Sequence, residues 1–175
     1  VVDHVCTDKD NLVYMGTTTA NTPVWLNRQA MECDHLILTG GVVYHFLAGF
    51  GGGPKSVLPG ISGYDTIMTN HTLSFNEGLG SGKNPKAALG NIEGSPLRHG
   101  MREAVAMARP TFTLNVVAGD GGIIFAAAGN LIQSHQAFID LINATDGVKI
   151  EEQAELVIAT AGGFPKDMNL YQTSK

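Results

Sequence analysis

The chain has 175 residues, of which 43% are hydrophobic and 15% charged, and its 11 Lys and Arg against 16 Asp and Glu give a formal net charge of −5. This apolar content excludes an intrinsically disordered chain and is enough to bury one core. Basic residues form no run, which argues against non-specific nucleic-acid binding. No apolar stretch approaches the roughly 20 residues of a membrane-spanning helix, and the N-terminus does not resemble a signal peptide.

Two cysteines, Cys6 and Cys33, are too few for a disulfide framework and form no CxxC pair, so we expect the reduced thiols of a cytoplasmic protein. The 22 glycines are nearly twice the average usage of about 7%. They gather in turns beside apolar runs, which predicts loops that approach a ligand closely. Because the first residue is Val1 and not Met, we expect the chain to be a segment of a longer protein.

In chain order, the apolar residues 12–15 predict a buried strand. Thr22 followed by Pro23 predicts the N-cap and first turn of a helix that runs to about Cys33. Residues 35–39 predict a second strand. Strand, helix and strand within about thirty residues are typical of a βαβ unit in a parallel sheet.

The middle of the chain is less regular. Glycines, prolines and aromatic residues over 42–63 predict a long functional loop. One or two helical turns are expected over 65–71, and a polar excursion on the surface over 74–94.

The second half alternates clear elements: a helix from Ser95 to about Arg109, a hairpin from 112–118 and 123–128, a helix over 130–145, a buried strand over 155–161, and the start of a helix at Met168. We therefore expect an α/β fold with a mixed, largely parallel sheet, flanked by helices and with Gly-rich loops at strand ends. We place one α/β domain over 1–150 and the start of a following segment over 151–175.

The most informative stretch runs from Gly40 to Lys55. Three consecutive glycines, 51–53, leave the backbone bare, so that N–H groups can converge on an anion. Lys55 adds a positive charge or an amine nucleophile. The stretch is not a P-loop, because Pro54 stands where that motif requires Gly. Glycine content alone leaves anion binding and a plain flexible loop both open.

Histidines bracket this stretch: His45 lies ten residues before Lys55, and His71 sixteen residues after it. A lone histidine is more often solvated or satisfied within the fold, but two around a Gly-rich lysine loop indicate a site. His4 is left open. Three others fit a strand start or the polar faces of helices and need no function: His35, His99 and His135.

Near the C-terminus, Gln172 and Lys175 are three residues apart and would share one face of a helix. At a helix start, an amide and a cation can hold a small carboxylate. Spacing alone favours the simpler interpretation, in which both are solvated surface residues.

A set of short motifs extends over nearly the whole chain: Gly16-Thr-Thr, Thr22-Pro-Val, Asn27-Arg28, His45, Gly49-Phe50, Gly52-Gly53, Lys55, Pro59-Gly60, Thr66-Ile67, Asn70-His71, and then Gly162-Gly-Phe-Pro-Lys-Asp with Tyr171-Gln172 and Lys175. In this combination and spacing the chain resembles the lactate racemase family. Members of that family are racemases and epimerases of 2-hydroxy acids that use a nickel-pincer nucleotide.

The resemblance implies a role for each candidate residue. Lys55 would form the covalent thioamide link to the pyridinium mononucleotide, and His71 would be the protein's nickel ligand, a task that suits neutral imidazole. His45 would be one of two acid/base histidines. Gln172 and Lys175 would contact the substrate carboxylate or hydroxyl, and glycines 51–53 would lie near the nucleotide phosphate.

The resemblance also implies a context for the chain. A 2-hydroxy acid is the expected substrate, and cofactor-maturation enzymes are the expected partners. Residues 1–150 would bind the cofactor and 151–175 would begin a substrate-contacting segment. The second acid/base histidine and a substrate-binding arginine are expected upstream of Val1.

Departures from the family pattern leave alternatives open. Gly51 stands where many members have Ser, and Pro54 precedes the lysine, so the particular 2-hydroxy acid stays undecided. The competing hypothesis is a non-catalytic α/β module that binds a nucleotide or a metal. A hydrolase is a third, but no nucleophile with a paired base stands out in the sequence.

Overall fold

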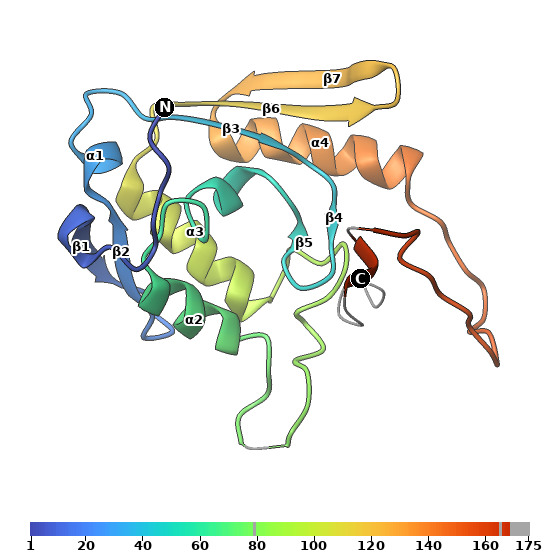
Figure 1. The fold of residues 1–175 in the computed structure, drawn as a ribbon. Helices are drawn as coiled ribbons and strands as arrows, with labels where there is room; N and C mark the ends of the chain where they lie inside the picture. The colour runs from blue at the N-terminus through green and yellow to red at the C-terminus, as the bar shows by residue number, and fades with distance from the viewer. Residues whose placement is uncertain (79, 165, 169–175) are drawn as a thin grey trace.

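The structure is a computed structural model that describes residues 1–78, 80–164 and 166–168. Figure 1 shows strands and helices in one α/β arrangement, so the predicted fold class is confirmed. The strands are β1 (Leu12–Thr17), β2 (Pro23–Asn27), β3 (Ile37–Gly41), β4 (Tyr44–His45), β5 (Gly49–Phe50), β6 (Phe112–Gly119) and β7 (Gly122–Gly129). The α-helices are α1 (Arg28–Met31), α2 (Tyr64–Thr72), α3 (Pro96–Ala108) and α4 (Leu131–Thr145), with 3-10 turns η1 (Lys9–Asn11), η2 (Gly53–Ser56) and η3 (Lys166–Met168).

The largest sheet has the order β3-β6-β7 and is covered on one face by α4 (Figure 1). Strand β3 runs parallel to β6, with Ile37 opposite Phe112, and β6 runs antiparallel to β7. Strands β1 and β2 form a separate antiparallel pair, as do β4 and β5. The sheet is mixed as expected, but parallel pairing is confined to β3 and β6 among the described strands.

The helix predicted from Thr22 to Cys33 is wrong over its first half, where the chain forms β2. Val24 and Leu26 are fully buried while Trp25 between them is 38% exposed, which is the period-two pattern of a strand. Pairing with β1 supplies the backbone hydrogen bonds. Pro23 is tolerated because it is the first residue of the strand. The predicted βαβ unit is therefore an antiparallel β1–β2 pair followed by the short α1.

Other predicted elements are confirmed. Helix α2 covers the expected turns, and β6 and β7 form the expected hairpin. Helix α3 follows Ser95, whose hydroxyl accepts the N–H of Arg98 at 3.4 Å, and α4 follows Asn130, whose side chain accepts two backbone N–H groups. The described part of 74–94 holds no helix, and its only strand pairing is one isolated bridge, Phe75 with Lys83.

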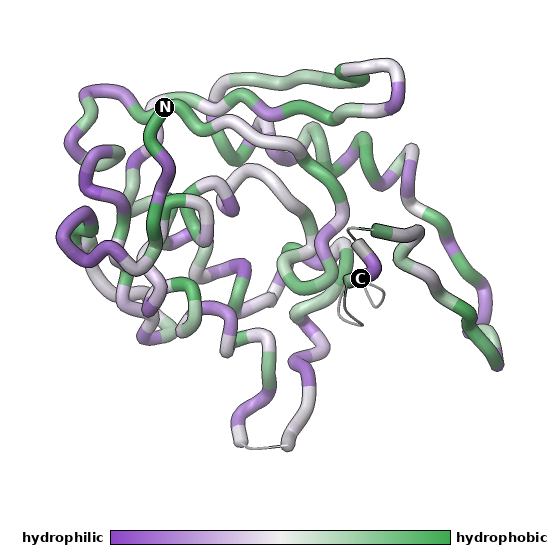
Figure 2. Tube along the Cα trace, viewed as in Figure 1, coloured by the Kyte–Doolittle hydropathy of each residue, from purple (hydrophilic) through white to green (hydrophobic). Residues whose placement is uncertain are grey.

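The strand predicted over 155–161 is absent from the structure. Leu156, Val157 and Ile158 are 78%, 75% and 91% exposed. Figure 1 shows that the chain beyond α4 leads away from the β3-β6-β7 sheet, and Figure 2 shows this apolar run in green on the outer segment. Without a neighbouring strand, the run has no partner for its backbone groups. The helix expected to begin at Met168 falls, beyond that residue, outside the described part of the chain. The division of the chain at residue 150 stays a prediction.

Two groups of buried apolar residues stabilise the fold on either side of η2. The first joins β2 and α3, with Leu26, Leu97 and Met101 among its members. The second includes Phe50 from β5 and Phe138 from α4. Both helices contact η2, so the glycine-rich stretch lies where the two groups meet. None of the described helices is long and apolar enough to cross a membrane.

Candidate functional site

Lys55 lies in η2, directly after the β4–β5 hairpin, and its side chain is half-buried. Its backbone N–H donates to the carbonyl of Gly52 at 3.1 Å. Gly52 and Gly53 both have positive φ, of 62° and 53°, and a Cβ at Gly53 would overlap the ring of His135. These glycines are needed because the backbone turns left-handed and packs directly against a side chain.

The amides of the glycine run do not all face outward. Gly51 donates its N–H to the carbonyl of Val43 at 2.7 Å, and Gly53 donates to Oδ1 of Asn115 at 3.5 Å. An anion at this loop would therefore meet the amide of Gly52 and the charge of Lys55 rather than three converging N–H groups. Phosphate binding by residues 51–53 stays a prediction, with the amide of Gly52 and the charge of Lys55 as the expected contacts.

Two buried side chains hold the loop through hydrogen bonds to its backbone carbonyls. Arg98 of α3 is 3% exposed, and its Nη1 donates to the carbonyls of Ala48 and Phe50 at 3.3 and 3.1 Å. His135 of α4 is 4% exposed, and its Nε2 donates to the carbonyl of Gly51 at 2.8 Å. Nη2 of Arg98 donates to Nδ1 of His135 at 3.2 Å, so the two side chains act as one unit. We call this pair the Arg98–His135 clamp.

The protonation states of the clamp follow from burial. Desolvation lowers the pKa of Arg98 to about 10, with a further contribution from Arg102, and leaves the guanidinium charged at neutral pH. Desolvation also lowers the pKa of His135 to about 4, and the charges of Arg98 and Arg102 add to that effect. The hydrogen bond to Gly51 opposes it. His135 is therefore neutral at pH 7 and carries its proton on Nε2.

His135 was expected on the polar face of its helix, and this prediction is wrong, because the side chain lies inside the protein. The signal was present in the spacing. His135 comes four residues after Leu131 and three before Phe138, and both of those side chains are buried. Positions at i+4 and i−3 share one face of a helix, so His135 belongs to the apolar face.

Other histidines have local roles. His35 and His99 are exposed, and Nε2 of His99 lies 3.6 Å from a carboxylate oxygen of Glu103 on the same helix. His4 bridges two segments, with its Nε2 2.9 Å from the carbonyl of Ser62 and its Nδ1 3.1 Å from Nδ2 of Asn27. These contacts give His4 a structural role.

His45 is half-buried in β4, at the start of the hairpin that leads to Lys55. Its Nδ1 accepts the backbone N–H groups of Leu47 and Ala48 at 3.3 and 3.1 Å, and its ring stacks on that of Phe46. Because Nδ1 is an acceptor in both contacts, the proton of the neutral imidazole lies on Nε2.

His71 is half-buried in the last turn of α2. Its Nδ1 lies 2.7 Å from the carbonyl of Ile67, four residues earlier, and must donate to that oxygen. The lone pair of the neutral ring is then on Nε2. Histidines that bind metals usually fix their ring in this way, with the second nitrogen hydrogen-bonded to a carbonyl or carboxylate.

The residue before His71 ties α2 to α3. Asn70 is fully buried, and its Nδ2 donates to the carbonyl of Leu97 at 3.1 Å. Leu97 directly precedes Arg98, which holds the loop of Lys55. The first turn of α3 therefore contacts both the loop that leads to Lys55 and the helix that carries His71. Gln172 and Lys175 lie outside the described residues.

Side chains that could form a complete metal centre are not clustered. Within the described part of the chain, no group of three or more His, Cys, Asp and Glu could hold a metal ion. A metal bound by Nε2 of His71 would thus take further ligands from a bound molecule.

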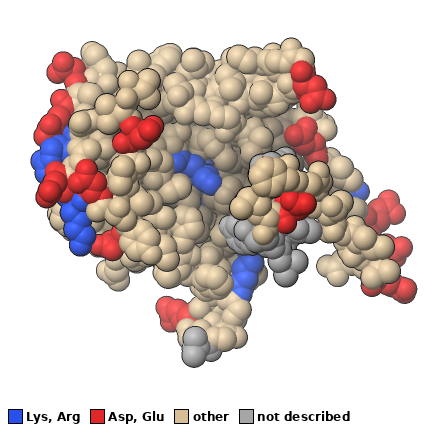
Figure 3. Space-filling view, viewed as in Figure 1, with Lys and Arg blue, Asp and Glu red and all other residues tan. Residues whose placement is uncertain are grey.

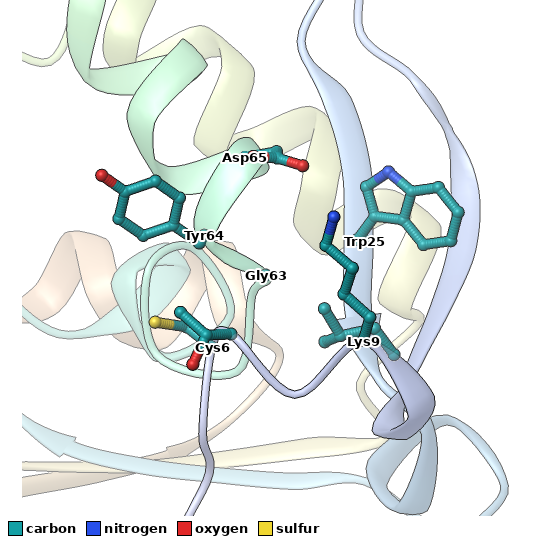
Figure 4. A pocket seen from close by; sticks show the side chains of 8 residues that line it. Cys6, Lys9, Trp25, Gly63, Tyr64 and Asp65 are labelled. Atoms are coloured by element: carbon teal, nitrogen blue, oxygen red, sulfur yellow. The ribbon is translucent and has the colours of Figure 1, made fainter.

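A separate cavity of about 540 Å³ lies beside the N-terminal end of α2. Figure 4 shows Lys9 reaching toward Asp65, with Trp25 on one side and Cys6 and Tyr64 on the other. The full lining is Cys6, Thr7, Lys9, Leu12, Trp25, Gly63, Tyr64 and Asp65. It includes none of the predicted cofactor residues, and the sequence analysis did not predict it.

Figure 3 shows how charged side chains are distributed over one face of the molecule. On the face shown in Figure 3, Lys and Arg are scattered, and Asp and Glu concentrate toward two ends. This face offers no continuous basic patch.

Comparison with known proteins finds lactate racemases, both by family model and by individual relatives. The family model of the lactate racemase N-terminal domain matches residues 1–82. The lactate racemase of Lactiplantibacillus plantarum is 37% identical over 176 residues, which cover 100% of this chain and 40% of that protein. The lactate racemase of Thermoanaerobacterium thermosaccharolyticum is 34% identical, over 99% of this chain and 39% of that protein.

Structural comparison agrees. The lactate racemase apoprotein from Thermoanaerobacterium thermosaccharolyticum superposes with a TM-score of 0.85 at 32% identity, covering 97% of this chain and 39% of that chain. The chain thus spans about two fifths of the length of the curated relatives it matches.

Proposed function

Since this chain belongs to the lactate racemase family, we propose that it is the part of a 2-hydroxy acid racemase or epimerase that carries the cofactor anchor and the metal ligand. The observation that carries the proposal is the extent of the likeness. At 37% identity it covers the whole chain and so includes His45, Lys55 and His71.

The residues present suit a nickel-pincer nucleotide. Lys55 supplies the amine for a covalent thioamide link, and Nε2 of His71 supplies one nickel ligand because Nδ1 is bonded to Ile67. When bound, the group would accept a hydride from the substrate carbon and return it, and the protein supplies orientation and proton transfer.

We assign to His45 the transfer of a proton at the substrate hydroxyl oxygen. In the structure its Nδ1 accepts from two backbone amides, so the neutral ring carries its proton on Nε2. A ring in this state can give up a proton from Nε2 but cannot accept one there. Acceptance of a proton there requires the ring to leave the amides of Leu47 and Ala48, and catalytic hydrogen bonds commonly rearrange between the free and substrate-bound enzyme.

Substrate binding by Gln172 and Lys175, a cytoplasmic location and a partnership with cofactor-maturation enzymes belong to the same proposal. They rest on the family resemblance and, for the location, on the unpaired thiols of Cys6 and Cys33. A small 2-hydroxy acid is the proposed substrate class.

The test is the mass of the complete protein, expressed with and without cofactor-maturation enzymes. We expect a mass increase only with maturation, mapped to the peptide that contains Lys55, and its loss in Lys55→Ala. Lys86→Ala removes an exposed lysine elsewhere and serves as the control. An adduct that survives Lys55→Ala would contradict the attachment site. A protein without adduct after maturation would favour the non-catalytic module.

A further inference from the structure

We propose that Arg98 and His135 are positioning residues for the cofactor anchor: they hold residues 48–53 in place so that Lys55 and His71 can engage one bound cofactor. The inference rests on the proposed attachment at Lys55 and goes beyond it, because neither residue belongs to the predicted site. Both lie on helices that follow the glycine loop in the chain by more than forty residues.

The loop has little support of its own. Strands β4 and β5 have two residues each, and η2 is a single 3-10 turn. The clamp instead donates to three of its carbonyls, those of Ala48, Phe50 and Gly51. The carbonyl of Ala48 also accepts the backbone N–H of Phe50. A buried carbonyl left without a donor is costly, so these bonds select the loop conformation.

The chemistry of Arg98 favours positioning over charge pairing. Among the described residues no carboxylate forms an ion pair with it, and its buried Nε has no hydrogen-bond partner. Its other contacts go to two carbonyls and one imidazole. A buried charge without a counterion is expensive. What arginine offers here is a rigid fork of donors that reaches several acceptors at once.

His135 adds a steric contact to its hydrogen bond. Its ring packs against Gly53, where no side chain fits. Because Nδ1 of the ring is itself held by Arg98, the position of Nε2 under Gly51 is fixed. Lys55 follows Gly53 by two residues, so a shift of the ring would move the anchor.

The same turn of α3 also reaches the predicted metal ligand. The carbonyl of Leu97 accepts from Asn70, and Asn70 precedes His71. The clamp and this bond together set the backbone of Lys55 relative to that of His71. A group attached to one residue and coordinated by the other requires that separation to be constant.

The experiment uses the complete protein and two readouts. Amide hydrogen exchange of the peptide spanning 48–56 is measured without maturation enzymes, and the fraction of Lys55 that carries an adduct is measured after limited maturation. His135→Leu removes both hydrogen bonds of the ring, whereas His135→Gln keeps an N–H donor for Gly51. Thr18→Val is the control, because it removes a buried hydrogen bond to Thr22 in the β1–β2 turn.

We expect His135→Leu to speed exchange of the loop peptide about tenfold or more, as the loss of a buried hydrogen bond implies, with little change in β6 and β7. Attachment at Lys55 should fall by a similar factor, and His135→Gln should restore most of both. Thr18→Val should leave both unchanged at matched thermal stability. Should His135→Leu fail to fold, Arg98→Lys takes its place as the loss variant, and His135→Gln stays the conservative comparison.

Two results would overturn the proposal: a folded His135→Leu with unchanged loop exchange and attachment, or equal losses in Thr18→Val. An absence of adduct on Lys55 in the matured wild type would instead overturn the proposed function, and with it the purpose of the clamp. The exchange measurement separates the two failures.

Discussion

Asn70 and Leu97 join helices α2 and α3 through one buried hydrogen bond, from the side-chain amide of Asn70 to the backbone carbonyl of Leu97 at 3.1 Å. The close approach depends on Gly100, since a Cβ there would lie 2.6 Å from Nδ2 of Asn70. The glycine therefore weakens α3 by its low helix propensity and in return allows the two helices to meet beside His71.

Gly100→Ala tests this contact. Alanine should stabilise the helix by about 1 kcal/mol, but displacement of Asn70 costs a buried hydrogen bond of about 1–3 kcal/mol, so we expect a net loss of stability and weaker nickel retention. Urea unfolding and metal analysis of the matured protein measure the two effects. Ala106→Gly lies on the exposed side of the same helix and should lose about 1 kcal/mol with nickel retained. Equal nickel loss in both variants would count against the link.

Gly53→Ala tests the packing of the loop on His135. Gly82→Ala is its matched control, because Gly82 also has a positive φ, of 80°, but has open space around its Cβ position. Both variants should lose about 1–2 kcal/mol from the left-handed backbone, and Gly53→Ala should lose more because the new methyl group meets the imidazole. In the double variant Gly53→Ala with His135→Ala, part of that excess should disappear. Chemical denaturation of the wild type, Gly53→Ala, His135→Ala and the double variant measures this excess. Strictly additive losses of stability would contradict the contact.

Stability should depend on pH through His135. Its pKa is about 4 in the folded protein and about 6.5 in an unfolded chain, so the unfolded state binds the proton first as the pH falls. The contribution is fully present above pH 6.5 and is lost progressively between pH 6.5 and about 4. The full difference is roughly 3 kcal/mol.

Unfolding free energies of the wild type and His135→Gln, measured from pH 7.5 to 4.5, check this dependence. Carboxyl groups titrate in both proteins, so the difference between the two curves isolates the histidine. Both proteins contain Arg98 and Arg102, whose charges disfavour protonation of the His135 ring in the wild type. Parallel curves would show that His135 does not titrate in this range.

Variants of His45 and His71 should differ in which measured property they lose. His71→Ala should keep the adduct on Lys55 and lose nickel, because it removes the predicted ligand. His45→Ala should keep the adduct and the nickel and lose about 10²–10⁴-fold in racemisation. Metal analysis, peptide mass and interconversion of enantiomers distinguish the variants, with the exposed His99→Ala as control. Nickel loss in His45→Ala alone would exchange the two roles.

The sequence predicted those elements whose signals are local. Ser95 and Asn130 cap α3 and α4, and the glycine-rich turn after residue 118 marks the β6–β7 hairpin. The error at Thr22 and Pro23 arose because the same dipeptide suits a helix start and the first residue of a strand. Pairing with β1, a tertiary contact, decided between them.

The contacts of the Arg98–His135 clamp could not be predicted from the sequence, for a related reason. Gly51 and His135 are 84 positions apart, and Phe50 and Arg98 are 48 apart. No local pattern links such residues. The glycines suggested an open backbone for a ligand, whereas Gly53 is bare because a side chain of the protein itself fills the space.

The Arg98–His135 clamp also bears on where this protein can be divided. The lactate racemase N-terminal domain model matches only as far as residue 82, and both clamp residues lie beyond that point. A protein cut there would keep Lys55 and His71 but leave the carbonyls of Phe50 and Gly51 without the donors that the clamp provides. Phe50 would also lose the apolar neighbours that α4 provides. Residues 1–82, the part that the family model matches, therefore lack the side chains that hold the anchor loop, and we expect that transplanting the anchor into another protein requires α3 and α4 as well.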